Sequence, residues 1–307
     1  MLPAPGFHHL HLNTMDPAAA IDFYTRRFSS TSPTTWGGLP ALHSPTNVLI
    51  LFTKVDVPPK TSPQTAIWHF GWHVLDTRQT MDRFRSETDV TLLPLYTGDG
   101  DGSVFVSSDT WPGAAGLLGR TLEQITEARA TGVQPTRNGG FGYIAGPDGA
   151  MVEYAGNQPV ERFNHVHMWQ EHPFCAQLWY QEHLNAPVTA GRGMQSATAD
   201  NCMVERTPDL TFPALAPEGM YRAPSSAVAF DDVAFAWYMR QGDRPLVSPR
   251  GYVWDHVALS VQDLDAWRDK LHGEGVTFLE ETYPLGDTRA VMIEGPSLEA
   301  IELVEVR

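Results

Sequence analysis

Apolar and polar residues alternate at four places along the chain, and each of these runs opens on a histidine. In the first run, His9, His11 and Asn13 alternate with Leu10 and Leu12. Successive side chains of a β-strand point to opposite faces, so the leucines share one face and the polar residues share the other. The pattern predicts a strand whose leucines pack on a core and whose histidines line the opposite face.

The same run recurs three times, which indicates internal duplication. The later copies are HFGWHVLD at 69–76, HVHMWQEH at 165–172 and HVALSVQD at 256–263. Three of the four copies place an aspartate seven residues after the histidine, where its side chain can cap the start of a helix. Apolar residues at spacings of three and four follow the first and last copies, as in an amphipathic helix. Each copy therefore predicts a strand, a turn and a helix.

A second repeated feature closes each half of the chain. The segments GPDGAMVEY at 146–154 and GPSLEAIEL at 295–303 both place a glutamate six residues after the proline. Gly-Pro before an alternating apolar run is typical of a turn that leads into a strand. The glutamates are Glu153 and Glu302, and a carboxylate within an apolar strand is costly unless a cationic group meets it. We therefore expect both glutamates to have such a partner.

These repeats divide the chain into four modules of the βαβββ type, which is an α+β architecture. Pairing the modules in chain order predicts two domains, at 1–158 and 159–307. The segment 185–250 is rich in Pro, Gly, Ala and Ser and is longer than the corresponding connection in the first half. It predicts a long insertion in the second domain, as either a lid over that domain's cavity or a surface excursion.

Composition and charge narrow the class of protein. The chain has 307 residues, of which 42% are hydrophobic, enough to fill two cores. The formal charge of −15 repels phosphate groups, so neither a nucleic acid nor an anionic membrane surface is an expected partner. No stretch reaches the roughly 18 apolar residues that span a bilayer, and the N-terminus lacks the pattern of an export signal. We expect a cytoplasmic protein, or an exported one if a signal has been removed.

The two cysteines do not form a metal-binding motif. Cys175 and Cys202 lack the CxxC spacing of a thiolate site, and two cysteines cannot build a disulfide framework. We expect buried thiols, with a single disulfide as the alternative.

The histidines and glutamates together predict metal sites. A lone strand histidine is more often a hydrogen-bonded buried group than a ligand, but each half of the chain holds two repeat-start histidines and one strand glutamate. Two neutral imidazoles and one carboxylate bind Fe(II), Mn(II) or Zn(II) and leave coordination positions open for a substrate. A closed structural site is disfavoured because it normally takes four protein ligands, and the pattern offers three per half.

The four modules, the histidine at the start of each and the glutamate at the end of each half resemble the vicinal oxygen chelate superfamily. Its members include glyoxalase I-like lyases, extradiol ring-cleaving dioxygenases, epimerases, thiol transferases and bleomycin-binding resistance proteins. The resemblance covers nearly the whole chain apart from 185–250, and implies a curved mixed sheet in each domain that forms a metal-binding cup. The metal ligands it implies are His9, His69 and Glu153 in the first domain and His165, His256 and Glu302 in the second.

The resemblance further implies a metal-dependent enzyme that acts on a small organic substrate with two adjacent oxygens. Extradiol ring cleavage with Fe(II) is favoured by the four modules and by Tyr143, ten residues before Glu153. The extradiol pattern also expects a histidine shortly before this tyrosine, where Arg137 and Asn138 stand, and Met292 takes the place of the tyrosine in the second half.

Two alternatives stay open. One is a glyoxalase-like lyase or isomerase that uses Zn, Mn or Ni and moves a proton with its ligand glutamate. The other is a protein that sequesters a small molecule without chemistry.

Three residues are candidates for catalysis. The resemblance to extradiol dioxygenases implies that Tyr143 donates a hydrogen bond to a substrate or intermediate oxygen. His11 and His73 lie on the predicted cup face, and an imidazole titrates close enough to neutrality to act as a general base. The alternative for both histidines is that they line the cavity. The expected partner is a small-molecule substrate, and the sequence leaves a homo-oligomer open.

Overall fold

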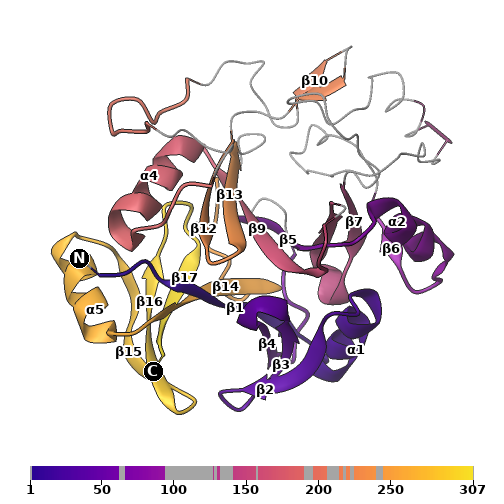
Figure 1. The fold of residues 1–307 in the computed structure, drawn as a ribbon, viewed down its shortest axis with the longest axis horizontal. Helices are drawn as coiled ribbons and strands as arrows, with labels where there is room; N and C mark the ends of the chain where they lie inside the picture. The colour runs from indigo at the N-terminus through magenta and orange to yellow at the C-terminus, as the bar shows by residue number, and fades with distance from the viewer. Residues whose placement is uncertain are drawn as a thin grey trace.

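The computed structural model describes residues 2–61, 66–93, 127, 130–131, 141–156, 158–189, 196–205, 214–216, 219–221, 225–239 and 245–306. These residues form two large curved mixed sheets with helices packed on their outer sides (Figure 1). The predicted α+β architecture of repeated modules is therefore confirmed.

The first and fourth modules build the larger sheet. Its eight strands lie in the order β15-β16-β17-β14-β1-β4-β3-β2. Their bounds are Gly6–Thr14 (β1), Ser32–Trp36 (β2), Leu39–Ser44 (β3), Val48–Lys54 (β4), Trp254–Val261 (β14), Phe278–Leu285 (β15), Thr288–Glu294 (β16) and Ala300–Glu305 (β17). The two opening strands, β1 and β14, run antiparallel at its centre.

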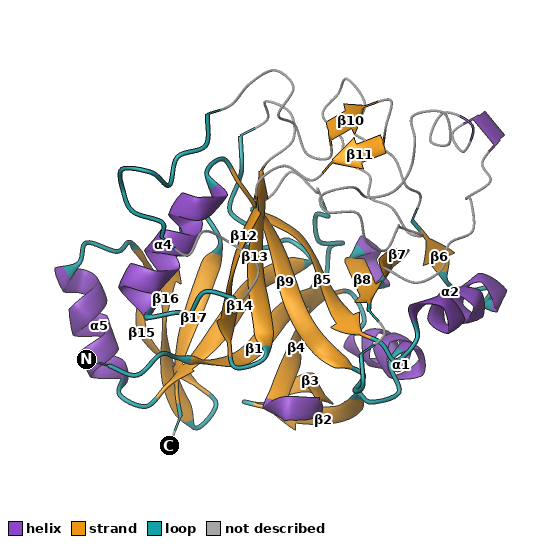
Figure 2. Ribbon diagram, turned by 45° about the horizontal axis from the view of Figure 1, so that its top comes forward, coloured by secondary structure: helices purple, strands orange, loops and turns teal. Residues whose placement is uncertain are grey.

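The second and third modules build the smaller sheet, with the order β12-β13-β9-β5-β8-β7-β6. Its strands are Ile67–His73 (β5), Thr91–Leu92 (β6), Phe141–Ala145 (β7), Met151–Ala155 (β8), Arg162–Gln170 (β9), Ser225–Phe230 (β12) and Val233–Met239 (β13). A separate pair joins Ala214–Ala216 (β10) to Gly219–Tyr221 (β11). Figure 2 shows the strands of both sheets between the outer helices.

The helix that follows each opening strand begins where the repeat predicts. The helices are Pro17–Arg27 (α1), Thr77–Ser86 (α2), Pro173–Leu184 (α4) and Leu264–Gly273 (α5), and one-turn 3-10 helices lie at Pro45–Asn47 and Pro147–Gly149. Asp16, Asp76 and Asp263 accept hydrogen bonds from backbone N–H groups of the first turns of α1, α2 and α5. No helix among the described residues is long and apolar enough to cross a membrane.

The pairing of modules in chain order is wrong, because each sheet takes strands from both predicted domains. The boundary between 158 and 159 falls within one sheet, where β5 pairs with β9, while β1 pairs with β14 in the other. Consecutive modules do meet, but through a helix and a turn. Tyr180 on α4 donates a hydrogen bond to Glu299 in the Gly-Pro turn of the fourth module, at 2.8 Å. The four opening strands share one pattern, so that pattern does not state which of them pair.

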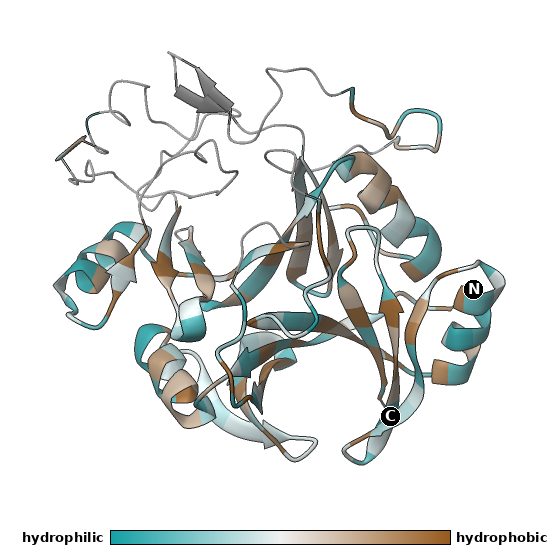
Figure 3. Ribbon diagram, turned by 180° about the vertical axis from the view of Figure 1, so that it is seen from behind, coloured by the Kyte–Doolittle hydropathy of each residue, from teal (hydrophilic) through white to brown (hydrophobic). Residues whose placement is uncertain are grey.

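The apolar faces of the strands lie against the helices. Leu10 and Leu12 are buried, as their alternation predicts, and Phe28, the residue after α1, stacks on Trp72 of β5 with ring centroids 4.2 Å apart. Figure 3 shows apolar residues along the strands and hydrophilic ones on the outer helical surfaces. The helices therefore occupy one face of each sheet and leave the histidine face free for a site.

Two expectations about the third module change. Strands β12 and β13 fall within 185–250 and complete the smaller sheet, so that segment is not an insertion over its whole length. The parts of 185–250 at 190–195, 206–213, 217–218, 222–224 and 240–244 lie outside the described residues, as does the expected lid. Cys175 and Cys202 form a disulfide, which fastens α4 to the segment that follows it, so the disulfide alternative is the one adopted.

Candidate metal centres

Three strands of the smaller sheet bring four ligand-type side chains together. His69 lies on β5, Glu153 on β8, and His165 and His167 on β9. The parallel pairing of β5 with β8 places Glu153 next to Gly71, and the antiparallel pairing of β5 with β9 places His165 opposite the same glycine. We call these four side chains centre A.

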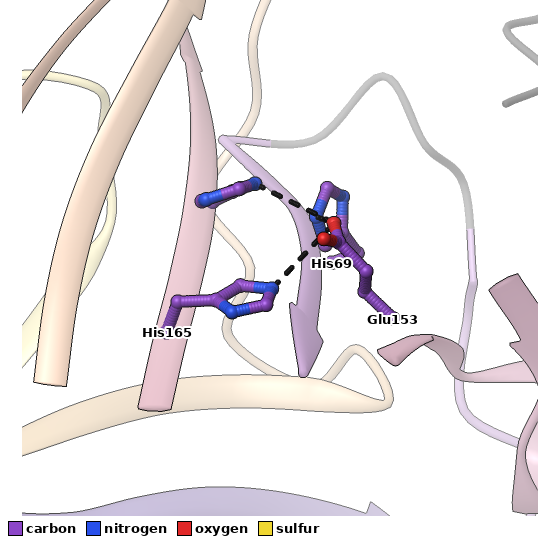
Figure 4. Close-up of side chains that lie close together, drawn as sticks. His69, Glu153 and His165 are labelled. Atoms are coloured by element: carbon purple, nitrogen blue, oxygen red, sulfur yellow. Dashed lines mark ion pairs between the residues drawn. The ribbon is translucent and has the colours of Figure 1, made fainter. Parts of the chain in front are cut away.

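The ligand atoms of centre A point toward one another. Glu153 Oε2 lies 2.6 Å from His69 Nε2, 3.6 Å from His165 Nε2 and 4.0 Å from His167 Nδ1. Figure 4 shows the carboxylate of Glu153 facing the rings of His69 and His165. All four residues are buried, and one ligand atom from each lies within 4.8 Å of the others. Ligand atoms at about 2.0–2.2 Å from a shared ion have separations of this size.

Gly71 makes room for the centre. A Cβ atom at this position would lie 2.6 Å from Cε1 and Nε2 of His165 and 2.6 Å from the carbonyl oxygen of Glu153. The ring of His165 therefore lies against the backbone of β5, which only a glycine permits.

A polar chain behind His165 orients its ring. His165 Nδ1 donates to Asn164 Oδ1 at 2.8 Å, and Asn164 Nδ2 donates to His73 Nε2 at 2.7 Å. Because Nδ1 is the donor in this hydrogen bond, Nε2 faces the centre and would present its lone pair to a cation bound there. His73 thus lies behind the cluster, and its role as a general base stays a prediction.

The buried carboxylate of centre A is held ionised by its neighbours. Burial by itself raises the pKa of Glu153, but the imidazoles of His165 and His69 outweigh burial and hold the pKa well below its ordinary value. Apart from the imidazoles of the cluster itself, Glu153 Oε2 and His165 Nε2 have no hydrogen-bond partner among the described residues. Buried polar atoms are nearly always satisfied, so a cation between them fits this donor set.

Tyr143 lies beside centre A. It is the direct partner of Glu153 in the β7–β8 ladder, and its ring centroid lies 4.9 Å from that of His69. The residue is buried beside the cluster. Its catalytic role stays a prediction.

The larger sheet holds a second cluster, which we call centre B. His9 and His11 lie on β1, His256 on β14 and Glu302 on β17. Glu302 Oε2 lies 3.5 Å from His9 Nε2 and 3.9 Å from His256 Nε2. Ligand atoms of the three histidines lie within 4.8 Å of one another. His11 therefore lies in the cluster itself, and its role as a general base stays a prediction.

Charged and hydroxyl groups orient the ligands of centre B. Asp255 Oδ1 accepts a hydrogen bond from His256 Nδ1 at 2.6 Å and pairs with Arg250 at 3.0 Å. Tyr283 donates to Glu302 Oε1 at 2.5 Å. Burial raises the pKa of Glu302, opposed by His256 and by the Tyr283 hydrogen bond.

The histidines of β1 are held neutral. Burial, helped by the neighbouring His8, lowers the pKa of His9 well below its ordinary value. Burial and the nearby His256 lower the pKa of His11 to about 3. A neutral imidazole is the form that binds a metal ion.

The six predicted ligands thus fall into two centres, but in a different grouping. His9 was expected with His69 and Glu153, and it lies with His256 and Glu302; His165 joins centre A instead. The correction follows from the strand pairing, since β1 neighbours β14 and β5 neighbours β9. That these residues bind metal stays a prediction.

Sequence reasoning missed His167 as a member of centre A, although its position two residues after His165 was visible. It also missed the residue before the repeat histidine, Asn164 or Asp255, which orients the ring that follows it.

A partly open pocket lies beside centre A. Its lining includes Lys60, Trp68, His69, Tyr252 and Trp254. The other three residues of centre A are not part of this lining, so the pocket adjoins the centre on one side and is not the space enclosed by its ligands.

Comparisons with known proteins agree with this architecture. No protein-family model matches the chain, and no curated protein matches its sequence. Glyoxalase I from Zea mays matches with a TM-score of 0.61 and 14% identity, over 98% of this chain and 92% of that one. A proposed dioxygenase from Bacillus subtilis subsp. subtilis str. 168 matches with a TM-score of 0.54 and 8% identity, over 99% and 86%. The chain therefore has the fold of the vicinal oxygen chelate superfamily.

Proposed function

We propose that the protein is a metal-dependent enzyme that acts on a small organic substrate with two adjacent oxygens. The observation that carries the proposal is the pair of buried clusters, each made of histidines from two modules and one glutamate. Five of their ligand atoms are buried and have no hydrogen-bond partner outside the clusters among the described residues: His9 Nε2, Glu153 Oε2, His165 Nε2, His256 Nε2 and Glu302 Oε2.

In each centre, two histidines and one glutamate would bind the ion directly. His69, Glu153 and His165 would hold the ion of centre A, and His9, His256 and Glu302 that of centre B. A divalent cation supplies Lewis-acid stabilisation of negative charge on the substrate oxygens. Iron, zinc, manganese and nickel all accept imidazole and carboxylate ligands.

The reaction that we propose is proton transfer next to a carbonyl, as in a lyase or isomerase. Both centres contain a buried glutamate that can hold a proton close to the substrate. Only centre A has a tyrosine opposite this glutamate, because Met292 takes that position in centre B. A proton-transfer reaction thus uses what the two centres share, and the full-length likeness to a glyoxalase I agrees with it.

Ring cleavage by an extradiol-type oxygenase is the second candidate, in centre A alone. It is favoured by Tyr143, which is buried next to His69 and Glu153. The hydroxyl would donate to a substrate oxygen.

Apolar side chains beside centre B suit a substrate with an apolar part. Trp36 of β2 and Tyr283 of β15 both pack against a small buried cluster formed by Ala258, Ala290 and Val304. Large aromatic side chains bury much apolar area on contact with a ligand.

Metal loading followed by two assays separates the candidates. The protein is loaded in turn with Fe(II), Zn(II), Mn(II) and Ni(II), and each form is tested for oxygen uptake with catechols and for solvent deuterium exchange into α-hydroxycarbonyl compounds by NMR. Deuterium exchange without oxygen uptake supports the lyase or isomerase. Oxygen uptake supports ring cleavage, and ligand binding with neither reaction supports sequestration.

A further inference from the structure

Each module offers a second ligand position besides its opening histidine. In every module the opening strand pairs in parallel with the last strand. This pairing places the residue two positions after the histidine beside one residue of the last strand. The four pairs are His11 with Leu51, Gly71 with Glu153, His167 with Ala236, and Ala258 with Glu302.

In each pair, one residue is a histidine or glutamate that could bind a metal ion, and the other is not. Where the last strand carries a glutamate, the opening strand carries Gly71 or Ala258. Where the last strand carries Leu51 or Ala236, the opening strand carries a histidine. The glutamate and the second histidine thus replace one another at the same place on the sheet.

We propose that each centre holds its ion with four protein ligands, three histidines and one glutamate, and that His167 and His11 are the fourth ligands. The inference rests on the proposed function, because it assumes that both centres bind a cation. It goes further by assigning a ligand and by limiting the reaction.

The geometry of centre A supports His167 as a ligand. It is the direct antiparallel partner of His69, and their ring centroids lie 4.5 Å apart. Its ring stacks on that of His165 with a centroid separation of 4.4 Å, and Nδ1 lies 4.0 Å from Glu153 Oε2.

The geometry of centre B repeats this arrangement. His11 is the direct antiparallel partner of His256, and the two rings stack with centroids 4.4 Å apart. Thr53 Oγ1 lies 2.8 Å from His11 Nε2, and this contact leaves Nδ1 free of Thr53. A hydrogen bond to one ring nitrogen orients the other, as is usual for ligand imidazoles.

The ligand count bears on the reaction. Four protein ligands would close a tetrahedral site, but on a six-coordinate ion they leave two positions, which suffices for a substrate that binds through two oxygens. Ring cleavage at one ion requires a third position for O2 beside such a substrate. The four-ligand set therefore favours the lyase or isomerase over the oxygenase.

An exchange of the ligand between the two members of a pair tests the assignment. The background is His9→Ala with His256→Ala, in which only centre A is left intact. His167→Ala in this background should weaken Zn(II) binding at least about tenfold. Adding Ala236→Glu should restore most of the affinity, because the pair then matches Ala258 with Glu302. A role for His167 in packing alone predicts no such rescue.

The number of imidazole ligands per ion can also be measured on the wild-type protein, so that this result does not depend on whether a variant folds. X-ray absorption on the Zn(II)-loaded wild-type protein counts imidazoles per ion, and we expect three. His183→Ala is the matched control, since this histidine belongs to neither centre and its Nδ1 contacts Glu274 just after α5. It should leave metal binding unchanged.

The outcomes separate this inference from the proposed function. Three imidazoles per ion with rescue by Ala236→Glu supports the inference, even if no substrate is turned over. Two imidazoles per ion, with binding unaffected by His167→Ala, overturns the inference and leaves the proposed function standing. A wild-type protein that binds no metal overturns both.

Discussion

Gly71 gives a test of centre A that leaves every ligand in place. In Gly71→Ala, the new Cβ would lie 2.6 Å from the His165 ring and 2.6 Å from the carbonyl oxygen of Glu153. Non-bonded heavy atoms settle at about 3.5–4.0 Å, so the contact is about 1 Å too short. The carbonyl belongs to the β8 backbone, which is held by its pairing with β5. The ring of His165 or the β5–β8 pairing that carries Glu153 must therefore shift, and either shift moves a ligand of centre A.

The displacement sets the size of the effect. Metal–imidazole bonds of about 2.0–2.1 Å tolerate errors of only about 0.2 Å, so a shift of about 1 Å removes the ligand or strains it severely. We expect the affinity of centre A to fall about 10- to 100-fold, which is about 1.4–2.7 kcal/mol. The extra methyl group should also lower the free energy of unfolding by about 1–3 kcal/mol.

Competition with a chromogenic chelator measures the affinities of both centres, and thermal unfolding measures stability. Centre B is the internal control and should be unaffected. Gly273→Ala is the matched glycine control, because a Cβ there, at the end of α5, meets nothing within 4 Å. If Gly71→Ala binds two ions with wild-type affinity, His165 is not a ligand in the position described and the reasoning fails.

Three further predictions concern other residues. Tyr143→Phe should slow turnover in centre A with both ions retained; loss of metal in this variant would mean that the hydroxyl acts on the ligands and not on the substrate. Asp255→Asn should weaken centre B about 10- to 100-fold because it weakens the hydrogen bond to His256 Nδ1, and equal weakening of centre A would contradict this. Burial raises the pKa of Glu299 from 4.5 to about 7. The folded protein therefore holds this proton more tightly, and the stability it contributes is lost as pH rises from about 4.5 to about 7, by about 3 kcal/mol. Glu299→Gln should remove this part of the pH dependence in denaturant unfolding; an unchanged profile would refute the assignment.

The sequence predicts the individual strands and helices well. These depend on the spacing of apolar residues along the chain and on residues that cap the helix ends. The alternation of Leu10 and Leu12 with His9 and His11 sets the two faces of β1. The placement of Tyr143 opposite Glu153 also follows from the sequence, since a tight turn between two strands fixes the register of the residues on either side.

The same pattern does not predict which modules pair to form a sheet. Four strands that open on a histidine are equivalent in alternation, so nothing local states that His9 lies opposite Ala258 and not beside β5. Which opening strands pair depends on how the helices pack on the turns and on how the two sheets pack on each other. The proposed fourth ligand is hidden in the sequence for a related reason. The equivalence of the positions of His167 and Glu153 becomes visible only when each opening strand is aligned with the last strand of its module.

The stoichiometry of metal binding in paired variants tests the central claim most directly. The wild-type protein should bind two divalent ions per chain. His69→Ala combined with His165→Ala damages one centre and should leave one ion, whereas His69→Ala combined with His9→Ala damages both and should leave none. Elemental analysis of the dialysed proteins gives these numbers. A chain that keeps one ion in the second variant and none in the first would contradict the two centres described for this protein.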